Sequence, residues 1–345
     1  MKITPDTFGK ILYLNSPKND FLADSFLIGL KEIFGNKVFE FPANKFIYKK
    51  ENTDTTGMHG IGFTLYNSVK SESCIPYNEE FSLKEFDLII FGDIYRQSDI
   101  YLRWRKELDP KKTIILDGED TPALWPYYFA PWKKPYSLFY PKPHKRFVYF
   151  KREIIPYRTN YYRFYKLLPK FLTGKFSVPE NVFPISFSIP ESKIALNSMV
   201  KTKVFAKHIV DEEVCRNVPG SVTKYAFTNE QDYYNDLQQS KFGITTKRGG
   251  WDCLRHYEIA ANGAVICFKK LSQKPSECAP HGLVNGINCI EYSDYSDLKN
   301  KIENMSEDAY QKMRINSMEW VKKNSCENTV RQVLNLFTDK TKMIL

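Results

Sequence analysis

The seven cysteines of this chain are scattered from Cys74 to Cys326 and include no C-x-x-C pair. Disulfide frameworks and zinc sites need clustered cysteines at characteristic spacings, so we expect seven reduced thiols. The five histidines are equally dispersed. We therefore expect neither a metal site nor a redox cofactor.

Long apolar runs are also missing. No stretch approaches the roughly 18–20 apolar residues that span a bilayer, and the first twenty residues lack the apolar core of a signal peptide. Glycine and proline are not enriched, and 42% of the 345 residues are hydrophobic, which is enough for two ordinary domains with sizeable cores. We predict a globular, cytoplasmic protein.

The positive charge of the chain is concentrated in one segment. Residues 132–175 hold twelve Lys or Arg, a single acid (Glu153) and thirteen aromatic residues, whereas the rest of the chain is close to neutral. Three interpretations stay open. The segment is the solvated face of an ordered domain, a nucleic-acid-binding arm, or a surface that holds an anionic membrane or a lipid-diphosphate acceptor. We favour the third, which would place the protein peripherally on the inner face of a membrane.

The first half of the chain alternates short apolar runs with helical patterns. Residues 10–16 are a short apolar run, and residues 20–35 have apolar residues three and four apart, with Gly35 as a stop. Residues 86–93 and 111–120 are continuous apolar runs that end in acids. Such runs are typical of strands buried on both faces, and they predict a parallel sheet covered by helices.

A proline-rich connector at 177–192 separates this half from a second alternating unit. The second unit has expected helices at 228–240 and 252–262, expected strands at 241–246, 264–268 and 286–293, and two closing helices, capped by Ser306 and beginning near Glu327. The predicted fold is α/β, with two Rossmann-like domains at 1–190 and 191–325 and a C-terminal helix at 326–345. Ligands of such sheets bind at the carboxyl ends of the strands, so we expect a cleft between the domains.

A basic glycine loop follows the expected strand at 241–246. It consists of Lys247, Arg248, Gly249 and Gly250. Glycines permit close backbone approach, and a helix N-terminus presents free N–H groups to an anion. Together with two cations, this pattern predicts a phosphate or diphosphate site.

The helix after this loop carries Asp252, Arg255 and Glu258. We expect Asp252 to cap the helix, and Arg255 and Glu258 to share one face because they are three residues apart. An exposed Glu258 carboxylate suits two ribose hydroxyls, since it is only an acceptor. The alternative is a surface ion pair on an amphipathic helix.

Residues 225–335 resemble the nucleotide-sugar domain of GT-B glycosyltransferases, particularly the bacterial surface-polysaccharide and spore-coat type. The resemblance rests on the basic Gly loop, the R-x-x-E helix, and the segments 282–302 and 306–325. Gly250 stands eight positions before Glu258, where the commoner E-x7-E pattern has a glutamate.

The resemblance implies a GT-B-like fold and a nucleotide-sugar donor. It implies Glu258 on the donor ribose, and Lys247 or Arg248 with Arg255 near the diphosphate. The nucleotide sugar would be a co-substrate rather than a cofactor.

Candidate catalytic acids lie just past two strands of the first half. They are Asp93 in FGDIY, and Asp117, Glu119 and Asp120 in ILDGED. The functional interpretation is a general base or ligands of acceptor hydroxyls, and the alternative is turn and cap chemistry. We favour Asp120, then Asp93, because Asp117-Gly118 has the pattern of the turn itself.

The sequence therefore predicts a glycosyltransferase that moves a hexosyl or related sugar to a glycan or lipid-linked acceptor in surface polysaccharide or glycoconjugate synthesis. The alternatives are a basic nucleic-acid-binding protein that uses residues 132–175, and another phosphate-handling transferase on the same fold.

Overall fold

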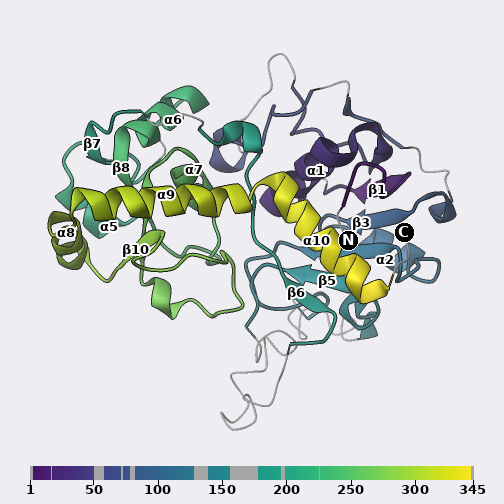
Figure 1. Ribbon diagram of the computed structural model, residues 1–345. Helices are drawn as coiled ribbons and strands as arrows, with labels where there is room; N and C mark the ends of the chain where they lie inside the picture. The colour runs from purple at the N-terminus through teal and green to yellow at the C-terminus, as the bar shows by residue number, and fades with distance from the viewer. Residues whose placement is uncertain are drawn as a thin grey trace, which may run out of the picture.

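The computed structural model describes residues 3–16, 18–49, 58–70, 73–77, 82–127, 139–155, 178–195, 199–224 and 226–342. The chain forms two parallel sheets, one from each half of the sequence (Figure 1). The first has the order β2-β1-β3-β4-β5-β6. Its strands are β1 (Ile11–Leu14), β2 (Val38–Phe41), β3 (Leu88–Phe91), β4 (Thr113–Asp117), β5 (Val148–Lys151) and β6 (Val182–Pro184).

The second sheet has the order β10-β9-β8-β7. Its strands are β7 (Lys203–Phe205), β8 (Ser240–Thr245), β9 (Val265–Lys269) and β10 (Cys289–Tyr292). The central strands of both sheets are almost wholly buried, as expected for parallel sheets covered on both faces. The predicted α/β class with parallel sheets is confirmed. The domain boundaries at 190 and 325 stay predictions.

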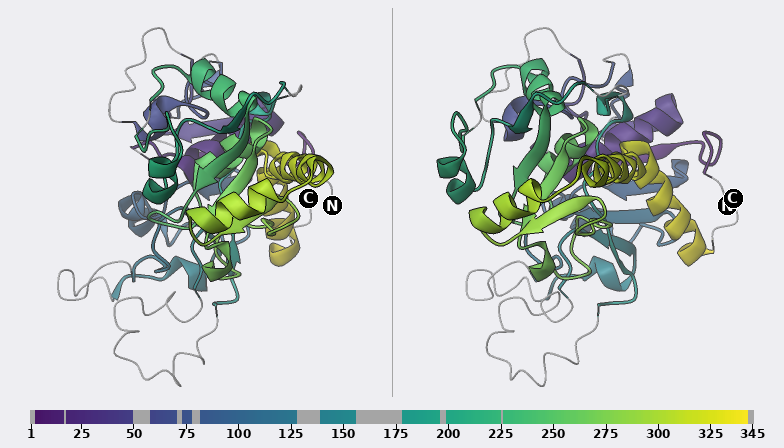
Figure 2. Two further views of the ribbon diagram at one scale, coloured as in Figure 1. Left: turned by 90° about the vertical axis from the view of Figure 1, so that its left-hand side faces the viewer. Right: turned by 60° about the vertical axis from the view of Figure 1, so that its left-hand side comes forward.

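Helices cover the sheets and link them. They are α1 (Phe21–Phe34), α2 (Ser98–Trp104), α5 (Glu212–Asn217), α6 (Glu230–Gln239), α7 (Leu254–Ala261), α8 (Tyr295–Glu303), α9 (Glu307–Lys323) and α10 (Cys326–Thr341). Helix α9 packs on α7 of the second unit, and α10 then crosses back to pack on α1 of the first (Figures 1 and 2). Ile189 pairs with the α9–α10 junction: its N–H donates to Asn324 and its carbonyl accepts from Cys326. The chain therefore crosses between the units twice at one place.

Two sequence predictions are confirmed at the level of single residues. Gly35 ends α1 with a positive φ of 54°, and the structure adds a cap at the start of that helix, where Asp20 accepts the N–H of Ala23. Ser306 caps α9. Such helix caps can be predicted from neighbouring residues, because a short polar side chain satisfies backbone groups within its own turn.

The expectation that residues 177–192 are only a connector is wrong. They include β6, which lies at the edge of the first sheet and ends at Pro184. An edge strand tolerates proline because one side of its backbone needs no ladder partner, so a proline-rich stretch concealed a strand.

The basic aromatic segment is described only at 139–155. In that part, Phe147, Tyr149 and Phe150 are core residues of β5 and its flank, and Lys151 and Arg152 are buried too. Lys145 and Arg146 are exposed. Residues 132–138 and 156–175 lie outside the described residues, so the membrane interpretation stays a prediction. None of the helices in the described ranges combines the length and the apolar character needed to span a membrane.

Gly29 sets how closely α1 and α10 approach. An added Cβ would lie 2.9 Å from Cγ2 of Val330 and closer still to the carbonyl of Cys326. We predict that Gly29→Ala lowers the free energy of unfolding by about 1–3 kcal/mol through overpacking, although alanine is the better helix former. Urea denaturation measures it. Gly9→Ala is the control, because its Cβ meets only the end of the Asp87 side chain, and we expect a change below about 0.5 kcal/mol. Equal losses in both variants would contradict the prediction.

Candidate functional site

A cleft of about 250 Å³ lies between the two units. From the first sheet it is lined by residues that follow β1, β3, β4, β5 and β6, and from the second by the loop between β8 and α7. These residues are Asn19, Asp20, Phe21, Arg96, Gly118, Glu119, Asp120, Arg152, Phe187, Arg248, Gly249, Gly250, Asp252 and Cys253. The cleft therefore lies at the carboxyl ends of both sheets, where open α/β folds bind ligands.

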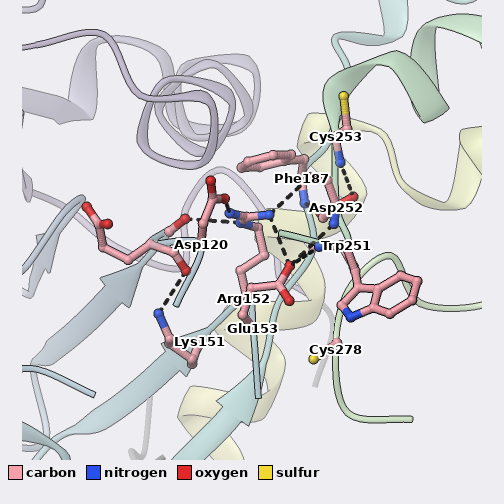
Figure 3. A network of polar contacts seen from close by, with 12 residues as sticks. Asp120, Lys151, Arg152, Glu153, Phe187, Trp251, Asp252, Cys253 and Cys278 are labelled. Carbon is pink, nitrogen blue, oxygen red and sulfur yellow. Dashed lines mark hydrogen bonds and ion pairs between the residues drawn. The ribbon is translucent and has the colours of Figure 1, made fainter. Parts of the chain in front are cut away.

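The guanidinium of Arg152 joins the two units (Figure 3). Its Nε donates to the carbonyl of Gly118 at 3.0 Å, and its Nη1 donates to the carbonyl of Asp252 at 3.1 Å and to Glu153 at 3.3 Å. Its Nη2 forms an ion pair with Asp120. Arg152 is fully buried, yet these carboxylates keep its pKa above its ordinary value despite the opposing effect of burial.

Glu153 completes this junction from the next position along the chain. One of its carboxylate oxygens accepts the N–H of Trp251 at 2.7 Å and the N–H of Asp252 at 3.3 Å. A Cβ on Gly250 would lie 2.5 Å from that oxygen, and a Cβ on Gly249 would overlap the carboxylate of Asp120. The glycine pair is thus required for the close approach of the second unit to acids of the first.

Asp252 does not cap α7, and that expectation is wrong. The N-cap is Cys253, whose side chain makes no capping bond. The Asp252 carboxylate instead accepts the N–H of Phe187 at 2.8 Å and the hydroxyl of Tyr257 at 3.1 Å. Burial raises the pKa of Asp252 to about 6, although Arg152 opposes the shift. The Asp252 side chain therefore bonds to Phe187 and Tyr257 instead of capping the helix that follows it.

The predicted catalytic acids differ in whether they line the cleft and in whether an arginine neutralises them. Glu119 and Asp120 both line the cleft, but Asp120 is held by Arg152. Burial, and secondly Asp117, raises the pKa of Glu119. Asp93 is buried outside the cleft lining and pairs with Arg96 at 3.0 Å. Burial raises the pKa of Asp93 to about 7.

Sequence reasoning missed both arginines of the first-domain wall. Arg96 lies between Asp93 at 3.0 Å and Asp20 at 3.3 Å. Arg152 was counted only as part of a basic segment. The signal for Arg96 was its position three residues after a strand-end acid, whereas Arg152 directly follows the buried strand β5.

The predicted donor-binding cations gather on the second unit. Lys247 and Arg248 are exposed, and Arg248 lines the cleft. The ammonium of Lys247 lies 5.7 Å from the ring centre of Trp251. Burial, followed by the charges of Arg255 and Arg248, lowers the pKa of His208 to about 4. Of the three predicted cations Lys247, Arg248 and Arg255, the cleft lining contains Arg248.

Glu258 is buried, so the expectation of an exposed carboxylate is wrong. One oxygen accepts the hydroxyl of Thr64 at 2.5 Å, and the other accepts the hydroxyl of Tyr233 at 2.8 Å. Burial raises the pKa of Glu258, and these two hydrogen bonds oppose that shift. Thr64 belongs to the first unit, which the sequence pattern around Glu258 could not reveal.

Within the described ranges, no three His, Cys, Asp or Glu side chains gather closely enough to hold a metal ion. No protein-family model matches the chain, and no curated protein does so either. Solved structures do match. A glycosyltransferase from Rickettsia africae superposes with a TM-score of 0.57 at 11% identity, covering 98% of this chain and 100% of that one.

HepE from Anabaena, solved with UDP and with UDP-glucose, superposes with TM-scores of 0.51 and 0.50 at 12% identity. These matches cover 96% of this chain and at least 99% of HepE. The chain therefore has a GT-B-type fold, with two parallel-sheet units on either side of a cleft.

We predict that Arg152→Met lowers the free energy of unfolding by about 3–5 kcal/mol, because it leaves Glu153 and Asp252 as buried carboxylates without their cation. Urea denaturation at pH 7.5 measures the loss. Lys241→Met is the control. It breaks an exposed ion pair with Glu307, which is worth below about 1 kcal/mol. A loss no larger for Arg152→Met than for Lys241→Met would refute this account of the junction.

Proposed function

We propose that this protein is a glycosyltransferase that moves a sugar from a nucleotide-sugar donor to a hydroxyl of a glycan or lipid-linked acceptor. One observation carries the proposal: a single cleft brings Glu119 of the first unit together with Arg248 and the Gly249–Gly250 loop of the second unit. The fold shared with a glycosyltransferase and with HepE, which was solved with UDP-glucose, supports it.

In this proposal the second unit binds the donor. Arg248 and Arg255 offset the charge of the diphosphate, and Glu258 accepts hydroxyls of the ribose. Lys247, Gly249 and Gly250 shape the loop beside them. Charge-assisted hydrogen bonds from arginine suit phosphate oxygens because the guanidinium donors form a planar fork.

We assign the catalytic base to Glu119 in place of Asp120. Asp120 is engaged by Arg152, whereas Glu119 lines the cleft and has a raised pKa. In an inverting transfer, Glu119 takes the proton of the acceptor hydroxyl. The acceptor oxygen bonds to C1 of the sugar as the bond from C1 to the diphosphate breaks, and the nucleoside diphosphate leaves with its electron pair.

The acceptor that we propose is defined only by class, as a glycan or a lipid-linked molecule with a free hydroxyl. The basic segment 132–175 supports a lipid-linked acceptor in surface polysaccharide or glycoconjugate synthesis, and peripheral attachment to the inner face of a membrane. Its exposed cations Lys145 and Arg146 would meet anionic headgroups.

The first test of this function is nucleotide binding. UDP, GDP, CDP and dTDP are screened by thermal shift, because a ligand of the native state raises the melting temperature. We predict that Arg248→Met and Arg255→Met each weaken binding of the best nucleotide roughly ten- to a hundredfold, as expected for a lost charged hydrogen bond. Arg216→Met, an exposed cation of α5, should leave binding unchanged. Salt-sensitive RNA binding with no nucleotide binding would favour the nucleic-acid alternative.

The second test concerns the base. Glu119→Gln should lower turnover by about 10²–10⁴-fold and leave nucleotide affinity within twofold, because Glu119 is assigned to the acceptor side. A base must be ionised, so wild-type turnover should fall as pH decreases through a pKa above the ordinary glutamate value of about 4.3, and Glu119→Gln should lose this dependence. Glu107→Gln, an exposed acid, is the control. Wild-type turnover in Glu119→Gln would exclude this assignment.

A further inference from the structure

The carboxylate of Glu258 is bound by hydroxyl groups on both of its oxygens. Tyr233 of α6 belongs to the same unit as Glu258, but Thr64 comes from the first unit, 194 positions earlier in the chain. A carboxylate is only an acceptor, and two hydroxyls, one on each oxygen, are also what the adjacent hydroxyls of a ribose offer.

Thr64 is held on the second unit by further contacts. Its N–H donates to Glu230 at 2.5 Å, and its hydroxyl lies 2.8 Å from that of Tyr234. The ring of the neighbouring Phe63 stacks on Tyr233 at 6.0 Å between centres. We call residues 58–67, the segment that contains both, the strap.

The backbone of the strap is strained. Ile61 and Thr64 have φ values of 57° and 70°, in the left-handed region that β-branched residues rarely adopt. Asn67 also lies there, at 52°. Such conformations persist only where surrounding contacts hold them. In the strap these include the contacts with Glu258, Glu230 and Tyr233.

We propose that the Thr64 hydroxyl occupies the position of a donor hydroxyl on Glu258, and that a nucleoside diphosphate must displace the strap to bind. This rests on the proposed function, in which Glu258 binds the donor ribose. The incoming hydroxyls replace the one that Thr64 withdraws, so the buried carboxylate keeps its donors. The strap then relaxes from its left-handed backbone.

The strap lowers the apparent affinity for the nucleotide. Only the fraction of molecules with a released strap can bind, and the apparent dissociation constant rises by the inverse of that fraction. Weakening the strap therefore tightens binding, whereas a residue that merely positions Glu258 would weaken binding when removed.

The test is the affinity of Thr64→Val for UDP, GDP, CDP and dTDP, measured by calorimetry. Valine keeps the β-branched shape and removes the hydroxyl. We expect the best nucleotide to bind about tenfold more tightly, the lower end of the effect of losing one hydrogen bond to a charged group. Thr64→Ser, which keeps the hydroxyl, should bind as wild type does. Thr113→Val removes another buried hydroxyl of the first unit, one bonded to Asp109, and should leave the affinity unchanged.

Unchanged or weaker nucleotide binding by Thr64→Val overturns the role proposed for the strap. Should that variant fail to fold, amide hydrogen exchange on the wild type decides. Peptides that cover residues 58–69 should exchange faster when the nucleotide is added, and equal or slower exchange overturns the proposal. If none of the four nucleotides binds the wild type or any variant, the proposed function itself fails, and the strap fails with it. If the wild type binds a nucleotide and Thr64→Val binds it no more tightly, the strap proposal fails and the proposed function stands.

Discussion

The buried charge of Arg152 is the constraint on which the arrangement of the two units depends. Removing a guanidinium from water is costly unless carboxylates and carbonyls replace the water. Asp120 and Glu153 supply that compensation from the first unit, and the carbonyl of Asp252 supplies it from the second. The interaction is therefore complete only when the two sheets face each other. It also fixes the loop that precedes α7, whose N–H groups bond to Glu153.

This junction divides the acids of the cleft between structural and chemical tasks. Asp120 and Glu153 neutralise Arg152, and they are committed to the contact between units. Glu119 stands beside them with a raised pKa and remains suited to proton transfer. The strap makes a second contact across the units, at Glu258. The first contact is a buried ion network, whereas the second is the hydroxyl of Thr64, which is carried on a strained backbone and bonds to Glu258.

Much of the fold could be predicted, because burial on both faces leaves a continuous apolar run in a parallel strand. The runs that contain β1, β3, β4, β8 and β9 all have this property, and the helix stop at Gly35 and the cap at Ser306 depend only on neighbouring residues. The edge strand β6 was missed because its prolines had the pattern of a connector. Asp252 and Glu258 were given the wrong surroundings. Their partners, Phe187 and Thr64, come from distant parts of the chain.

The sequence by itself determined the central strands, the helix stop at Gly35 and the cap at Ser306, since periodicity and capping act over a few residues. It also placed Glu119 and Arg248 just past the ends of strands whose carboxyl edges meet at the cleft. Only the tertiary structure decided which acids are neutralised, which glycines permit contact between units, and what bonds to Glu258. Those outcomes depend on desolvation and on partners 25 or more positions away, and neither is encoded in the spacing of nearby residues.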